Sequence, residues 1–130
     1  MRLKSLTRLF FLLLIMILLS ACNAINITPA RSVEIYYQAL ADKDETQLVT
    51  QSCSEWEPTA LLEYDSFRNV ETELKDVNCQ VVQDDDNTAT VRCEGVLSAS
   101  YGGEIREFPL SDREFTVVLE GGEWRLCGYE

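Results

Sequence analysis

The sequence predicts an α+β domain, in which three amino-terminal helices pack on an antiparallel β-meander of about four strands. Three observations support this fold class. Apolar residues recur at helical spacing up to about residue 69, and from residue 71 onward they alternate with polar residues. Glycine pairs separate later alternating segments, where antiparallel strands need tight turns.

The first 21 residues have the pattern of a bacterial signal peptide. Arg2, Lys4 and Arg8 come before eleven uninterrupted apolar residues at positions 9–19, and no acidic residue precedes Glu34. The apolar run is about 16 Å long as a helix, whereas a membrane span needs roughly 20 residues. We therefore expect residues 1–21 to direct export and not to span the membrane permanently.

Leu19-Ser20-Ala21-Cys22 resembles the lipobox of bacterial lipoprotein precursors. The resemblance implies that Cys22 becomes the first mature residue and carries several acyl chains, which attach a protein durably to a membrane. Ordinary secretion with an unmodified Cys22 is the alternative. Asn23 permits, by the same resemblance, transfer to an outer membrane. Residues 22–27 are a short tether of about 20 Å at most, which places the domain at residues 28–130 close to the extracytoplasmic face of the membrane.

Composition fits one acidic domain. Without residues 1–21 the chain keeps 109 of its 130 residues, enough for a single core. This part has all 22 acidic residues but eight of the 11 basic ones, so its formal charge is −14. Such a charge argues against nucleic acid and anionic lipid as direct partners.

The first helix is predicted to begin at Pro29. Thr28 is a good N-cap, and proline suits the first helical position because its missing N–H would have no acceptor there. Four apolar residues at helical spacing then predict one face packed on a core. They are Val33, Tyr36, Tyr37 and Leu40.

Two shorter helices are predicted to follow. Asp44 caps a helix that carries Leu48 and Val49. A third helix begins near Pro58, and its pattern changes around Asn69. Its apolar residues are Leu61, Leu62, Tyr64 and Phe67.

The part from Glu71 onward predicts half-buried antiparallel strands. Turns are expected at residues 84–88, at Gly102-Gly103 and at Gly121-Gly122. The last turn places Leu119 opposite Trp124 and Val117 opposite Leu126. The alternating positions are Val77, Cys79, Val81, then Ala89, Val91, Cys93, then Phe115, Val117, Leu119, and finally Trp124 and Leu126.

Four cysteines remain once Cys22 is acylated, and in an oxidising compartment they predict two disulfides. Sequence alone allows three pairings. A turn centred on Asp86 places Cys79 opposite Cys93 and Val81 opposite Val91, which favours a Cys79–Cys93 disulfide. Cys53–Cys127 follows by elimination. Zinc is disfavoured, because the chain has no C-x-x-C motif and no histidine.

Residues 28–129 resemble the nuclear transport factor two-like superfamily of cone-shaped α+β domains. The resemblance is carried by Tyr36-Tyr37-Gln38-Ala39-Leu40, by Lys43-Asp44 and by the closing Gly-x-Trp-x-Leu at residues 122–126. It implies a curved sheet that encloses a cavity, which the superfamily uses for catalysis, ligand binding and protein contacts alike, so the fold does not choose the function. The strand-rich half alone would also suit a cystatin-like or a lipocalin-like fold.

Aromatic residues are the candidates for core and cavity lining. They are Tyr36, Tyr37, Tyr64, Phe67 and Trp124. An isomerase or dehydratase of the superfamily needs a cavity acid or base with a hydroxyl donor. Asp65 beside Tyr64, with Tyr36, Tyr37 and Tyr101 as donors, has these residue types, but nothing in the sequence makes them converge. No catalytic residue is therefore assigned.

Asp84-Asp85-Asp86-Asn87-Thr88 is partly similar to the start of a calcium-binding loop. Ala89 replaces the glycine that such a loop needs, and Gly95 stands where a bidentate glutamate should be. A hairpin turn is favoured, since Asp and Asn are common in turns. We therefore predict no metal and no cofactor.

Together these features predict a lipid-anchored, non-enzymatic binding or accessory module of the cell envelope. Its expected partners are the membrane, through the anchor, and an unknown protein or small-molecule ligand. A small isomerase-like or hydratase-like enzyme that uses a cavity Asp and Tyr is the alternative. An envelope stress or assembly factor that contacts only proteins is a third possibility, and it predicts an exposed apolar patch.

Overall fold

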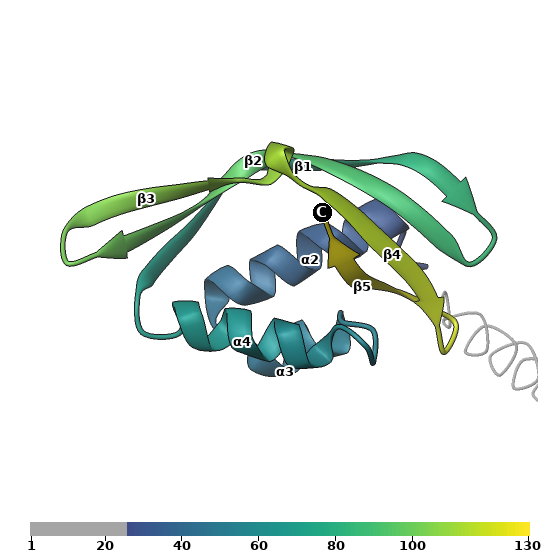
Figure 1. Cartoon of the computed structure of the whole chain (residues 1–130), viewed down its shortest axis with the longest axis horizontal. Helices are drawn as coiled ribbons and strands as arrows, with labels where there is room; N and C mark the ends of the chain where they lie inside the picture. Colours follow the sequence, from purple (N-terminus) through teal and green to yellow (C-terminus); the bar gives the residue numbers. More distant parts are fainter. Residues whose placement is uncertain (1–25) are drawn as a thin grey trace, which may run out of the picture.

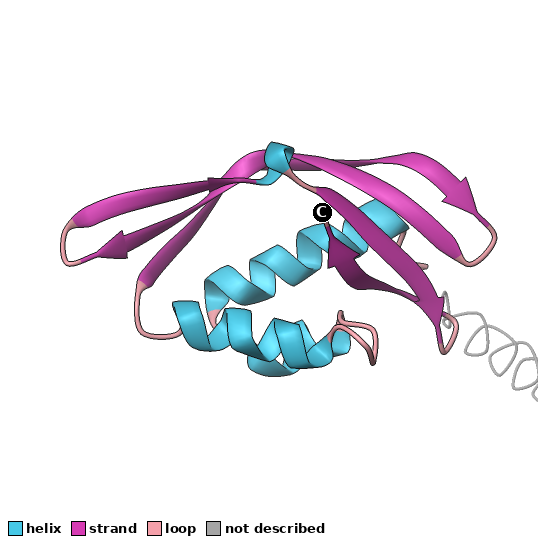
Figure 2. Ribbon diagram, in the orientation of Figure 1, coloured by secondary structure: helices cyan, strands magenta, loops and turns pink. Residues whose placement is uncertain are grey.

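The structure is a computed structural model that describes residues 26–130. The helices α2 (Pro29–Asp42), α3 (Glu45–Thr50) and α4 (Glu57–Phe67) come first. They precede β1 (Glu71–Asp85), β2 (Thr88–Tyr101), β3 (Glu104–Pro109), the 3₁₀ turn η2 (Leu110–Asp112), β4 (Glu114–Glu120) and β5 (Glu123–Tyr129). The helices lie under the concave side of a curved antiparallel sheet (Figures 1 and 2), which confirms the predicted α+β class.

The predicted signal peptide, the lipidation site Cys22 and most of the tether lie outside the described residues. The described part begins with Asn26 and Ile27, the last two residues of that tether. Within residues 26–130, no helix is long and apolar enough to cross a membrane.

Both predicted side-chain caps form. The Thr28 hydroxyl accepts a hydrogen bond from the Arg31 amide at 3.2 Å. The Asp44 carboxylate accepts one from the Gln47 amide at 3.0 Å. Each bond satisfies an amide that has no acceptor within the first helical turn, so the two caps fix where α2 and α3 begin.

The apolar face of α2 is the centre of the core. Its four predicted apolar residues are almost completely buried, and each contributes about 1.5–3 kcal/mol of stability by leaving water. Their partners in the core cluster include Phe115 and Val117 of β4 and Leu126 of β5. α2 is therefore the element against which the sheet closes.

α4 faces the core with only part of the predicted set of apolar residues. Leu62 is 68% exposed, and Ala60 is the buried residue of this helix. The inward face follows positions 60, 63, 64 and 67, and it includes the charged Glu63 between Ala60 and Phe67. The predicted residues Tyr64 and Phe67 lie on this face. Leu62 does not, because it lies about 200° around the helix from both Ala60 and Tyr64.

The sheet has five strands where about four were predicted, and it is not a simple meander. Its order is β1-β2-β4-β5, and β3 pairs with β2 as well. β2 is long enough to take two partners on one edge, β3 along residues 96–101 and β4 along residues 88–92. β3 was missed because almost all of its residues are exposed, so no alternation marks it.

The predicted strand registers are present. Cys79 lies opposite Cys93 in the first hairpin, and Leu119 lies opposite Trp124 in the last. The first turn consists of Asp86-Asn87 and is not centred on Asp86 as predicted. A bulge between Val81 and Gln83 compensates for this half-residue offset and restores the predicted pairs.

The long strands β1 and β2 bend together at Gly95. The register shifts between Lys75 and Asn78, and Asp76 there has a φ of 52°. Gly95 has a φ of 105°, and a Cβ at this position would lie 2.7 Å from the carbonyl oxygen of Lys75. Only glycine allows the two backbones to approach so closely, and bulges of this kind bend a sheet. The bend helps to wrap the sheet over α2 (Figure 1).

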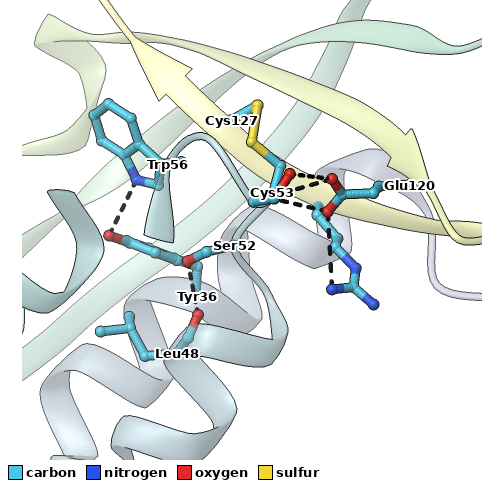
Figure 3. The surroundings of a disulfide bond; sticks show 9 residues. Tyr36, Leu48, Ser52, Cys53, Trp56, Glu120 and Cys127 are labelled. Carbon is cyan, nitrogen blue, oxygen red and sulfur yellow. Dashed lines mark hydrogen bonds and ion pairs between the residues drawn. A yellow bond between two sulfur atoms is a disulfide. The ribbon is translucent and has the colours of Figure 1, made fainter. Parts of the chain in front are cut away.

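Two disulfides are present, the pair that the hairpin register favours and the pair that follows by elimination. Cys79–Cys93 links β1 to β2, and Cys53–Cys127 links the segment after α3 to β5 (Figure 3). The Cys53 amide also donates to the Leu126 carbonyl at 2.9 Å. The sequence separation is 14 residues for Cys79–Cys93 and 74 residues for Cys53–Cys127. Chain-entropy arguments therefore give about 4.5 kcal/mol for Cys53–Cys127 and about 3 kcal/mol for Cys79–Cys93.

We predict that Gly95→Ala destabilises the domain by about 3 kcal/mol or more, because the new methyl group must displace backbone atoms of β1. Gly103→Ala is the matched control. Gly103 also has a positive φ, of 88°, but no atom lies within 4 Å of a Cβ there. Gly103→Ala should therefore lower the free energy of unfolding by only about 1–2 kcal/mol, the cost of a left-handed backbone at a residue other than glycine. Urea unfolding of both variants measures the difference, and equal losses would contradict the close-approach explanation.

Candidate functional site

Polar side chains from α2, α4 and β5 meet under the concave side of the sheet, around Glu63. The hydroxyl of Tyr36 on α2 donates to Glu63 Oε2 at 2.6 Å. The hydroxyl of Tyr129 on β5 donates to Glu63 Oε1. The indole N–H of Trp56 donates to the Tyr36 oxygen at 3.3 Å (Figure 3). Both oxygens of the carboxylate are thus bound by tyrosine hydroxyls of the same chain.

Arg113, which follows η2, extends this arrangement. Its guanidinium donates to the Tyr37 hydroxyl at 2.9 Å. Its Cζ lies 4.1 Å from the centroid of the Tyr129 ring, a cation–π contact. We call the connected set the tyrosine–glutamate network. Its members are Tyr36, Tyr37, Trp56, Glu63, Arg113 and Tyr129.

Burial keeps the tyrosine hydroxyls of this network protonated. Tyr36 and Tyr37 are at most 1% exposed. Loss of solvent, followed by the charge of Glu63, raises the pKa of both hydroxyls well above the ordinary value. Burial, followed by the hydrogen bond to Glu63, raises the pKa of Tyr129 to about 12. Near neutral pH the tyrosines are therefore neutral hydrogen-bond donors.

The network fits a structural role better than acid–base catalysis. A general base needs a carboxylate oxygen within hydrogen-bond reach of a substrate proton. Both oxygens of Glu63 already accept hydrogen bonds, and the two tyrosines buried most deeply are out of contact with water. The network instead supplies hydrogen bonds to the carboxylate of Glu63 beneath the sheet. Without these bonds the carboxylate would carry a large desolvation cost.

The structure brings together some of the predicted aromatic residues. Tyr36 and Tyr37 belong to the tyrosine–glutamate network. Tyr64 and Phe67 are part-buried on the same face of α4, and the Phe67 ring packs edge-on against Phe108 at 5.5 Å. Trp124 does not join them, because it lies at the β4–β5 turn opposite Leu119.

The acid and donor that the enzyme alternative requires do not converge. Asp65 is mostly exposed and forms a surface ion pair with Arg68 at 3.4 Å. Tyr101 lies at the tip of the β2–β3 hairpin, where the Arg106 guanidinium packs over its ring at 5.5 Å. Neither residue contacts the network through a hydrogen bond found among residues 26–130.

Sequence reasoning missed four members of the network: Trp56, Glu63, Arg113 and Tyr129. One available signal was the spacing of Glu63, which lies three and four residues from Ala60 and Phe67 on the inward face of α4. Arg113 had no such signal, because its place depends on how η2 connects β3 to β4 along the edge of β2.

The predicted hairpin turn within residues 84–88 is present, and its two central residues are Asp86 and Asn87, with Asp85 paired to Thr88. Within the described part of the chain, no three metal-ligating side chains gather into one cluster.

Several hollows lie on the surface, outside the network. One of about 400 Å³ lies between α2 and β1 and includes Glu34 and Asp42. A second of about 660 Å³ lies beside the end of α2 and includes Lys43. A third of about 530 Å³ lies at the β4–β5 turn and includes Trp124. None of these three is lined by a member of the tyrosine–glutamate network.

No protein-family model matches the sequence, and no curated protein matches it. Solved structures share its fold. A SEC-C motif containing protein from Rhodopseudomonas palustris aligns with a TM-score of 0.54 and 15% identity, over 80% of this chain and 78% of the other. A nuclear transport factor two-like protein with a cystatin-like fold from Novosphingobium aromaticivorans aligns with a TM-score of 0.52 and 15% identity, over 78% and 76% of the two chains.

A helical cell shape determining protein from Campylobacter jejuni has a TM-score of 0.50 and 11% identity. The alignment covers 77% of this chain but 38% of that protein. At these identities the similarities show the fold alone. The described domain therefore has a nuclear transport factor two-like, cystatin-like fold, as the sequence resemblance implies, and its function must be argued from its own residues.

We predict that Glu63→Gln destabilises the domain by about 1–3 kcal/mol, because an amide offers one acceptor oxygen to two tyrosine donors. Asp65→Asn on the outer face of the same helix is the control. It removes a surface ion pair and should cost less than about 0.5 kcal/mol. Chemical unfolding compares the two variants. A Glu63→Gln domain as stable as the Asp65→Asn domain would contradict the structural role of the network.

Proposed function

We propose that this protein is a lipid-anchored lipoprotein of the bacterial cell envelope that works as a non-enzymatic binding or accessory module. The lipobox at Leu19-Ser20-Ala21-Cys22 supports the anchor. The two disulfides favour an oxidising, extracytoplasmic compartment, because reducing compartments keep thiols free. Membrane attachment then comes from acyl chains on Cys22, in agreement with an apolar leader too short to span.

One observation carries the non-enzymatic part of the proposal. The interior of the cone is occupied by the tyrosine–glutamate network, whose carboxylate and hydroxyls bind one another. A substrate would have to break these bonds before it could reach Glu63. Asp65, the acid of the enzyme alternative, points to solvent. Binding is therefore assigned to the outer surface of the domain, and its partner to a protein or a small molecule.

The charge of the domain narrows the class of partner. The chain after residue 21 has a formal charge of −14, and most acidic residues of the described part are exposed. Polyanions such as nucleic acid are repelled by such a field, whereas neutral or cationic partners are not. Anchoring restricts the partner further, because the tether of residues 22–27 keeps the domain within about 20 Å of its anchor. The partner must therefore be accessible close to the membrane surface.

We predict that Cys22→Ser releases the protein from the membrane fraction of a bacterium that expresses the full chain. The thiol is the only group at this position that can accept the lipid, so the acylated mature form should be lost. Intact-mass analysis should find a wild-type chain that begins at residue 22 and carries acyl chains. Ser20→Ala keeps the small residue that the cleavage site needs and is the control.

The folded domain should be unaffected, because Cys22 belongs to neither disulfide. A change below about 0.5 kcal/mol in unfolding free energy is expected. Wild-type protein that retains residues 1–21, or that carries no fatty acid at Cys22, would contradict the proposed anchor.

A further inference from the structure

A surface notch lies at the end of the domain where the tether enters. Its volume is about 530 Å³, and Ile27, Gln51, Leu119, Glu123 and Trp124 are among its lining residues. The start of α2 and the β4–β5 turn lie at this same end of the molecule (Figure 1). We propose that this end docks on the bilayer surface, and that the notch receives the ethanolamine headgroup of a zwitterionic phospholipid. The inference rests on the lipid anchor proposed above.

The length of the tether places the notch next to the membrane. Cys22 precedes Asn26, which lines the notch, by four residues. Four residues reach at most about 14 Å when fully extended. The polar headgroup layer is itself about 5–7 Å thick on each side of the hydrocarbon core. An anchored domain therefore holds the rim of the notch at, or a few ångströms above, the headgroups.

The apolar residues of the notch suit this depth. Leu119 is 37% exposed although it lies on the core-facing side of the sheet. Trp124 is its cross-strand partner and is part-buried, as is Ile27. Tryptophan is enriched at the membrane–water interface, where its ring meets the apolar layer and its N–H meets water. A small apolar face beside the anchor point therefore gains contacts when the domain rests on a bilayer.

The polar groups of the notch favour a ligand that donates hydrogen bonds. Gln51 is 5% exposed, and its Oε1 has no hydrogen-bond partner among the described residues. Glu123 stands at the rim and forms one ion pair, with Arg125 at 3.3 Å. An acceptor without a partner, a carboxylate and an indole ring belong to residues that line the same notch, and this set of groups favours a small cation that carries N–H groups. Ethanolamine ammonium has this chemistry, whereas the quaternary ammonium of choline has no N–H to donate.

The test measures how close Trp124 comes to lipid. Residues 22–130, which contain every described helix and strand, are coupled through the Cys22 thiol to a maleimide lipid. The other four cysteines are in disulfides and do not react. The vesicles contain phosphatidylethanolamine or phosphatidylcholine, brominated at shallow acyl carbons that quench nearby tryptophan. Wild type is compared with Trp124→Phe, in which the remaining Trp56 lies on the helical side of the network.

Wild-type protein should lose about a third of its emission on brominated phosphatidylethanolamine, and Trp124→Phe should lose almost none. Quenching in phosphatidylcholine should be about twofold smaller, and Gln51→Leu should abolish this difference between the lipids. Leu119→Asp tests the docked face independently of Trp124→Phe. It places a carboxylate in the apolar face at a part-exposed position, and it should reduce the quenching of Trp124.

Equal quenching of wild type and Trp124→Phe would overturn the docked orientation. Equal quenching in the two lipids would overturn the ethanolamine assignment. Chemical coupling makes these results independent of natural acylation. A native chain without fatty acid would therefore refute the proposed anchor, while a vesicle-bound chain with an unquenched Trp124 would refute only the docking surface.

Discussion

The carboxylate of Glu63 is the group on which the arrangement of this domain depends. It accepts a hydrogen bond from Tyr36 on α2 and another from Tyr129 on β5, so one side chain of α4 connects three elements. A charge below the sheet is stable only when it is fully paired, and this requirement fixes how the three elements lie relative to one another. The same bonds engage the carboxylate and hydroxyls that this side of the sheet could offer to a ligand, which moves the expected function to the outer surface.

The sheet supplies the second half of this arrangement. β1 and β2 bend at Gly95, where the backbones approach too closely for any side chain. β2 pairs with β4 before the bend and with β3 after it, and η2 connects these two strands. Arg113, which follows η2, reaches the Tyr37 hydroxyl and the Tyr129 ring. Cys53–Cys127 then holds β5 against the segment that follows α3. The bend thus shapes the β1–β2 pair, whereas the network and the Cys53–Cys127 disulfide both hold β5.

Local physics made much of the fold predictable. Caps at Thr28 and Asp44, the apolar face of α2, the glycine turns and the hairpin register each depend on residues close in sequence. The Cys79–Cys93 pair followed from that register, and Cys53–Cys127 followed by elimination. The spacing of Glu63 on α4 was a signal for its inward position, but its role could not be predicted, because its hydrogen-bond partners lie 27 and 66 residues away. β3 was not predicted, because an exposed strand shows no alternation of apolar and polar residues. The position of the turn at Asp86-Asn87 was not predicted, because a bulge in β1 compensates for the offset.

The central claim is that the cone is closed by its own side chains, and the Tyr36 hydroxyl proton tests it most directly. In a domain of residues 26–130 with labelled tyrosine, proton NMR should detect this hydroxyl as a slowly exchanging resonance that shows contacts to Glu63. A solvent-accessible hydroxyl exchanges too fast to be seen. Failure to detect the proton, together with exchange as fast as that of the exposed Tyr101 hydroxyl, would mean that water and small molecules enter the cone, and the account would be contradicted.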